Sequence, residues 1–122
     1  MVDARGLRAD IAVAIALNDA DSYAGGELVV GSPVVAQRWK GRVGDCLVYP
    51  ASMPQRMEPV TRGERSVAML WLQSAIRAAN QRSLLFELWQ AAEALSTVRA
   101  PERDVERVRA SRAELLRMWS ER

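Results

Sequence analysis

The chain has 122 residues, 49% hydrophobic and 26% charged, which predicts one globular domain and excludes a largely disordered chain. With 17 basic against 15 acidic residues the net charge is only +2, so a strongly basic nucleic-acid-binding surface is not expected. The single cysteine excludes an intrachain disulfide, and no apolar run approaches the ~18 residues of a membrane span. We therefore expect a cytoplasmic protein that binds neither nucleic acid nor membrane.

Short strands separated by glycine and proline turns are predicted for the first part of the chain. Residues 8–17 alternate large apolar side chains with alanines, a period of two that is typical of a strand, and the alanine face predicts close packing or a cavity. Residues 65–73 are apolar on both faces, so this last long strand is expected at the centre of a sheet. Cys46 is expected to be a buried strand thiol. Further strands are expected at 27–30, 34–40, 46–49 and 55–60.

The apolar pattern of the remaining chain has a helical period. One stripe is formed by Leu84, Leu85, Leu88, Ala92 and Leu95. Asn80 is the expected N-cap of this helix, and a second helix is expected to begin near Pro101. We interpret the arginine-rich residues 99–122 as a solvated, salt-bridged helix face. The predicted fold class is therefore mainly β with C-terminal helices (α+β), with a β core over residues 1–74 and a helical segment over residues 75–122 packed on it as one domain.

Three segments follow one another in an order that resembles a known family. They are Gly-Gly-Glu-Leu-Val at 25–29, Gly-Asp-Cys-Leu-Val-Tyr-Pro at 44–50, and 55–65 before the last strand. With the helical segments 81–88 and 115–119, they resemble the C-terminal catalytic portion of the bacterial PKHD-type hydroxylases over nearly the whole chain. The resemblance implies an Fe(II)- and 2-oxoglutarate-dependent dioxygenase on a double-stranded β-helix (jelly roll), here partial because the family's N-terminal segment is missing.

The resemblance also implies a site. In the family a His-x-Asp pair and a distal His hold the iron, and an arginine ten residues beyond the distal His pairs with the far carboxylate of 2-oxoglutarate. Arg65 lies ten residues after Gln55, so Arg65 matches the cosubstrate arginine and Gln55 stands at the distal His position. Asp3 matches the carboxylate of the His-x-Asp, with Met1 in place of the first His.

Structural alternatives stay open for each of these residues. Asp3 can be a terminal carboxylate and Gln55 a polar residue at the end of a strand. Arg65 can be a structural arginine paired with Glu27 or Glu58.

The sequence contains no histidine, and this decides the functional expectation. A glutamine amide oxygen and a thioether are poor ligands for Fe(II), so neither Fe(II) nor 2-oxoglutarate is expected to bind stably. We expect a truncated or degenerate relative of the hydroxylases, inactive on its own, or alternatively a non-catalytic interaction module that uses exposed sheet edges. A homo-oligomer or a partner chain that covers the missing N-terminal strands is expected, and the substrate is not predicted.

Overall fold

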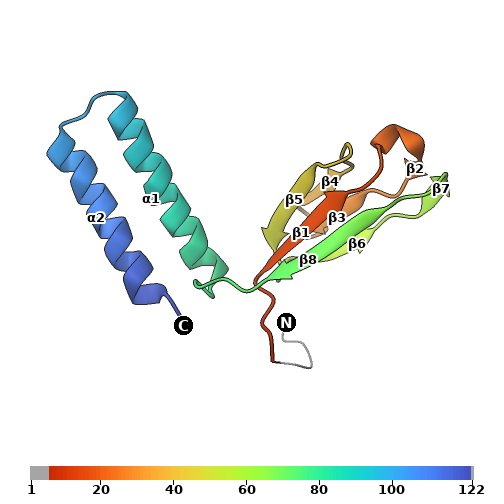
Figure 1. The fold of residues 1–122 in the computed structure, drawn as a ribbon, viewed down its shortest axis with the longest axis horizontal. Coiled ribbons are helices and arrows are strands. Elements are labelled where there is room, and N and C mark those ends of the chain that lie inside the picture. The colour runs from red at the N-terminus through yellow and green to blue at the C-terminus, as the bar shows by residue number, and fades with distance from the viewer. Residues whose placement is uncertain (1–5, 122) are drawn as a thin grey trace. The chain divides into compact units, whose positions relative to one another are not determined.

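The computed structural model describes residues 6–121, and the chain divides into two compact units, Met1–Gln73 and Ser74–Arg122 (Figure 1). Each unit is considered by itself. Among the described residues the first unit holds eight strands and a short 3-10 helix, and the second holds two α-helices. This composition confirms the predicted fold class, which is mainly β with C-terminal helices. The packing of the helical segment on the β core stays a prediction.

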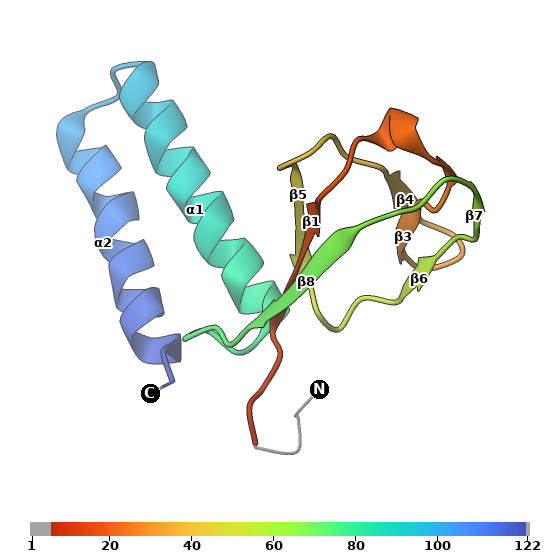
Figure 2. The same cartoon turned by 45° about the vertical axis from the view of Figure 1, so that its right-hand side comes forward.

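Antiparallel pairing organises the first unit into two three-stranded sheets, ordered β5-β1-β8 and β4-β3-β6, and a ribbon in which β2 pairs with β7. The two larger sheets form facing layers (Figure 2), and residues 6–121 contain no closed barrel. The double-stranded β-helix therefore stays a prediction. The strands are β1 (Ile11–Ala16), β2 (Ala24–Gly25), β3 (Leu28–Gly31), β4 (Ala36–Trp39), β5 (Cys46–Pro50), β6 (Gln55–Met57), β7 (Val60–Arg62) and β8 (Val67–Leu72), and the 3-10 helix is η1 (Ala20–Ser22).

The core of this unit lies on the alanine face of β1. Ala12 and Ala14 are 1% and 0% exposed, and they pack with Leu28, Val30 and Tyr49 in one buried cluster. Methyl side chains on the central strand leave room for the larger residues of the second sheet to approach closely. The predicted close packing on the alanine face is thus confirmed.

The opposite face of the same sheet is apolar as well. Residues that are directly opposed in an antiparallel sheet share a face, so the register places Val48 and Leu70 beside Val13 on this outer side. Val48 is 61% exposed and Leu70 is 48% exposed. The outer face of the sheet β5-β1-β8 is therefore a partly exposed hydrophobic surface.

Two predictions for this sheet are wrong. Within residues 6–121 the strand β8 lies at the edge of the sheet and pairs with β1 alone. One of its apolar faces belongs to the core and the other to the partly exposed outer side of the sheet. Cys46 is exposed instead of buried, since it is the first residue of β5 and lies opposite Ile15 on the outer face.

The segment predicted as one strand at 55–60 is two strands with different partners. β6 pairs with β3, whereas β7 pairs with β2. Pro59 lies between them and has no N–H for a ladder, although its carbonyl accepts a hydrogen bond from the N–H of Gly26 at 3.0 Å. The chain thus changes from one sheet to the other at this proline.

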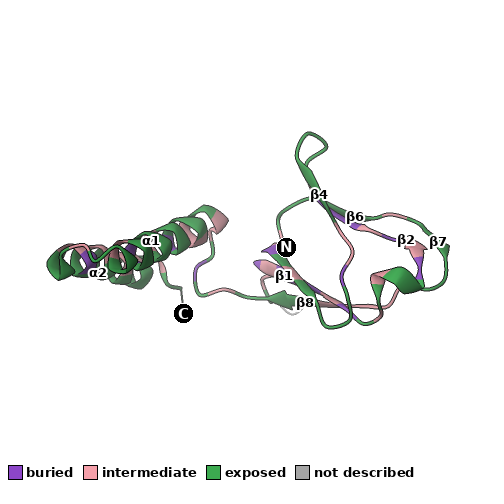
Figure 3. Ribbon diagram, turned by 90° about the horizontal axis from the view of Figure 1, so that it is seen from above, coloured by how far each residue is buried: buried purple, intermediate pink, exposed green. Residues whose placement is uncertain are grey.

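The second unit is a helical hairpin of α1 (Ala79–Thr97) and α2 (Glu102–Trp119). α2 begins next to Pro101 as predicted, but the N-cap of α1 is Ala78 rather than Asn80, which lies inside the helix. Most of both helices is exposed (Figure 3), and Leu85, Ala92 and Val105 are buried. No helix among the described residues is long and apolar enough to cross a membrane.

Exposed ion pairs lie in the arginine-rich segment that is expected to form a solvated helix face. Arg109 pairs with Glu106 at 3.0 Å and with Glu93 at 3.5 Å, and Arg117 pairs with Glu114. Hydrogen bonds to these carboxylates raise the pKa of both arginines above the usual value. These exposed pairs therefore occupy two arginines of the segment.

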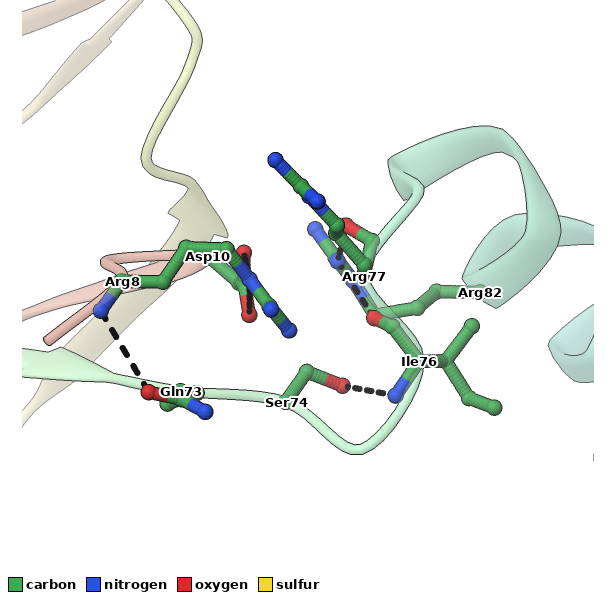
Figure 4. Close-up of polar contacts among 7 residues, drawn as sticks. All are labelled: Arg8, Asp10, Gln73, Ser74, Ile76, Arg77 and Arg82. Carbon is green, nitrogen blue, oxygen red and sulfur yellow. Dashed lines mark hydrogen bonds and ion pairs between the residues drawn. The ribbon is translucent and has the colours of Figure 1, made fainter. Parts of the chain in front are cut away.

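Hydrogen bonds hold the end of the β unit and the start of the helical unit (Figure 4). In the β unit, Arg8 donates through Nε to both carboxylate oxygens of the buried Asp10, at 2.8 and 3.0 Å, and through its backbone N–H to the side chain of Gln73. In the helical unit, Ser74 Oγ accepts from the N–H of Ile76 at 3.1 Å. The ends of both units are thus held by hydrogen bonds of their own.

Candidate functional site

A small cavity lies between the two facing sheets of the β unit. Its volume is about 10 Å³, which is close to the space that one water molecule occupies. The lining consists of apolar strand residues and one cation, namely Ala16, Tyr23, Gly26, Leu28, Trp39, Met57, Arg65 and Val67. The only charge on its wall is therefore the guanidinium of Arg65.

Arg65 reaches this wall from the loop that leads into β8. The side chain is half-buried, and its Nη1 donates to the carbonyl oxygen of Gly26 at 3.2 Å. Among the described residues Arg65 forms no ion pair with Glu27 or Glu58, because Glu58 pairs with Arg38 and Arg56 instead. The guanidinium thus keeps donors beyond the one bound by Gly26.

A second cation, Lys40, contacts Tyr23, which is one of the aromatic residues that line the cavity. Lys40 donates from Nζ to the carbonyl oxygen of Tyr23 at 2.8 Å, and the same ammonium lies 4.2 Å from the centre of the Tyr23 ring. A cation over an aromatic face is attracted by the ring quadrupole, so Lys40 braces Tyr23 against the cavity.

Gln55, which the resemblance aligns with the family's distal His, is not among the residues that line this cavity. It is the first residue of β6 and lies opposite Val30, and its side chain is exposed. Its Oε1 accepts a hydrogen bond from the hydroxyl of Tyr49, a core residue that is 5% exposed. Burial raises the pKa of Tyr49, so this hydroxyl is protonated and donating at neutral pH. Gln55 is therefore hydrogen-bonded to a core residue, whereas Arg65 is hydrogen-bonded to Gly26.

The residues present do not fit an iron centre. Asp3 and Met1 lie outside the described residues. Within residues 6–121 no three His, Cys, Asp or Glu side chains are grouped as metal ligands, and the sequence has no histidine. The neutral amide oxygen of Gln55 is a weak ligand for Fe(II) and already accepts a hydrogen bond from the hydroxyl of Tyr49.

Asn18 is a site residue that sequence reasoning missed. Its carboxamide donates to the carbonyl oxygen of Glu64 at 2.6 Å and accepts from the N–H of Ser66 at 2.9 Å, on either side of Arg65. The run that begins at Asn18 is polar and glycine-rich, which is typical of a turn rather than of a functional site. The only available signal was the frequent use of asparagine side chains to bond nearby backbone groups.

A larger depression of about 410 Å³ lies in the helical unit. It is lined by Leu88, Asp104, Arg107, Val108 and Ser111. None of these residues is a site residue that the resemblance implies, so the cavity beside Arg65 is the better candidate despite its smaller volume.

The fold and the site define a β-rich domain with two facing antiparallel sheets and one arginine on the wall between them. No family model matches the chain. It is 40% identical to the PKHD-type hydroxylase of Shewanella sp. (strain MR-7) over 115 residues. The aligned region is 94% of this chain and 51% of that protein. It is also 40% identical to the PKHD-type hydroxylase of Maricaulis maris (strain MCS10) over 116 residues, and this aligned region is 95% of this chain and 53% of that protein. Over nearly its whole length the chain is similar to these PKHD-type hydroxylases, and it spans about half the length of the curated relatives it matches.

Proposed function

We propose that the chain is a degenerate or truncated relative of the Fe(II)- and 2-oxoglutarate-dependent hydroxylases whose own turnover is lost or crippled. The family activity is oxidative hydroxylation coupled to decarboxylation of 2-oxoglutarate. The observation that carries the proposal is the position of Gln55, which stands where the family has its distal His and is hydrogen-bonded to Tyr49. Support also comes from relatives that are named PKHD-type hydroxylase.

Arg65 is the part of the site that the chain has kept. A guanidinium can hold a carboxylate through two parallel N–H···O bonds, which is the role that the family assigns to this arginine. A cavity of about 10 Å³ is far smaller than the ~300 Å³ of a typical small ligand pocket, so a dicarboxylate must open the sheets to enter. Without a metal chelate, one arginine contact of this kind contributes only about 0–1 kcal/mol. We therefore propose that 2-oxoglutarate is not bound stably.

The test is an anaerobic titration of the purified chain with Fe(II) and 2-oxoglutarate, followed by visible absorbance and by succinate formation in air. The proposal predicts no chelate absorbance band and no succinate. A Gln55→His variant is the matched comparison, since it restores one imidazole at the distal position. Succinate formed by the unmodified chain in proportion to its concentration would contradict the loss of activity.

A second candidate function is a non-catalytic interaction module, and the outer face of the sheet β5-β1-β8 supports it. β8 is an edge strand in the described part of the chain, and Leu70 and Leu72 are about half exposed on its outer side. Exposed apolar strands at sheet edges are sites of association. The module would bind a second copy or a partner chain through this surface.

Light scattering tests this second candidate. The unmodified chain should associate at micromolar concentration, and Leu70→Lys should weaken the association. Val98→Lys is the control, because Val98 is 73% exposed in the helical unit and lies outside this surface. A monodisperse monomer for the unmodified chain would exclude a second copy as the occupant of this surface.

A further inference from the structure

We infer that Asn18 is a positioning residue for Arg65, an inference that rests on the proposed role of Arg65 as the carboxylate-binding arginine. Asn18 lies two residues after the end of β1, and its side chain reaches the segment that leads into β8. Nδ2 donates to the carbonyl oxygen of Glu64 at 2.6 Å, and Oδ1 accepts from the N–H of Ser66 at 2.9 Å. These groups belong to the two peptide units that flank Arg65, so one carboxamide holds the backbone on both sides of it.

The side chain of Asn18 extends the hydrogen-bond ladder between β1 and β8 beyond the last backbone pair. The pairing of β1 with β8 ends at Ala16 opposite Val67, and one further backbone bond joins the N–H of Leu17 to the carbonyl oxygen of Ser66 at 2.9 Å. Beyond this point the chain turns away into η1. A carboxamide carries a donor and an acceptor in the same arrangement as a peptide group, so it can replace the next step of the ladder.

A third bond fixes the carboxamide itself. Nδ2 of Asn18 also lies 3.0 Å from Oγ of Ser22, which donates to the carbonyl oxygen of Asp19 at 2.6 Å. Both the donor and the acceptor of the carboxamide are therefore used, and its orientation is determined by three partners. This separates Asn18 from a surface asparagine, whose side chain would be free to rotate.

Arg65 is consequently held at both ends. Asn18 orients the backbone of Arg65, and the carbonyl oxygen of Gly26 accepts from its guanidinium at 3.2 Å on the cavity wall. An arginine side chain has many rotamers, so a defined backbone direction is needed for the guanidinium to stay on this wall. The clamp by Asn18 supplies that direction.

The test uses NMR of the whole chain and follows the Nε–H signal of Arg65, which is assigned by its loss in Arg65→Lys. In Asn18→Ala this signal should move toward the position of a solvated arginine, and the Ser66 N–H should exchange with water at least ~10-fold faster. Ser22→Ala is the matched control, because it removes one partner of Asn18 and leaves both bonds that flank Arg65. It should leave the Arg65 signal unchanged.

Asn18→Asp provides a second variant if Asn18→Ala does not fold. It keeps the acceptor for the N–H of Ser66 and loses the donor to Glu64, so the Arg65 signal should again move. Protection of Ser66 lost without any change at Arg65 would assign Asn18 a structural role only and overturn the inference.

Addition of 2-oxoglutarate in the millimolar range separates this inference from the proposed function. Shifts of the Arg65 signal in the unmodified chain that need millimolar 2-oxoglutarate and are lost in Asn18→Ala support a weak carboxylate-binding role of Arg65 and its positioning by Asn18. If the unmodified chain shows no shift, Arg65 has no carboxylate role, while its Nε–H signal in Asn18→Ala still decides whether Asn18 positions it.

Discussion

The hydroxyl of Tyr49 donates its hydrogen bond to the side-chain oxygen of Gln55, and this contact joins the core to an exposed strand. Tyr49 belongs to the buried cluster on the alanine face of β1, whereas Gln55 begins an exposed strand. The amide thus satisfies a polar group of the core.

Loss of the Gln55 side chain should therefore destabilise the fold. Gln55→Ala leaves the hydroxyl of Tyr49 with poorer partners, and we expect the free energy of unfolding to fall by about 1 kcal/mol. Urea denaturation measures the change. Arg56→Ala on the same strand is the control, since Arg56 is exposed and its pair with Glu58 contributes little. A double-mutant cycle with Tyr49→Phe should show coupling between the two residues, and strict additivity would contradict the contact.

Stability should depend on the ionisation of Tyr49 at high pH. Burial raises the pKa of Tyr49 above 10.0, its value in the unfolded chain. Below pH 10 both states hold the proton and this group adds no pH dependence. Above that pH the unfolded state loses the proton first, so stability falls as pH rises toward the higher pKa of the folded state. Denaturation series between neutral and alkaline pH should show this fall, and Tyr49→Phe should reduce it.

The small side chains of β1 should tolerate no enlargement. Ala14 is fully buried against the second sheet, so Ala14→Leu should cost about 1–3 kcal/mol through overpacking. Ala68 lies opposite Ile15 on the outer face of the same sheet, and Ala68→Leu is the matched control with a much smaller expected effect. Thermal unfolding of the two variants checks the prediction, and equal losses would show that the outer face is as tightly packed as the core.

A glycine that lies against a neighbouring strand should be more sensitive to substitution by alanine than a glycine with open space around it. Gly25 has φ +70°, and a Cβ there would lie 2.3 Å from the carbonyl oxygen of Pro59, whereas Gly44 has φ +87° and open space around it. Gly44→Ala should cost about 1 kcal/mol from backbone strain alone. Gly25→Ala should cost more because the backbone of Pro59 must also move. Comparable midpoints in urea for the two variants would contradict the close approach of β2 and β7.

Local patterns predicted part of this protein correctly. The period of two in β1 and the proline before α2 act over a few residues, so the strand and the start of the helix followed from neighbouring side chains alone. The resemblance singled out Arg65, and the structure places it on a cavity wall. The sequence also contains no histidine, so these residues alone cannot build a histidine-ligated iron centre.

Other features depended on pairing between distant segments. An apolar strand has the same pattern at the centre of a sheet and at an edge beside a bare hydrophobic face, so only the register placed β8 at the edge and exposed Cys46. The partners of Gln55 and Asn18 were likewise undetermined, because a polar side chain carries no record of which distant backbone or hydroxyl it will meet. The sequence by itself determined which chemical groups the chain possesses. The tertiary structure decided which of them meet, since hydrogen bonds form only between groups that the packing of the two sheets brings within reach.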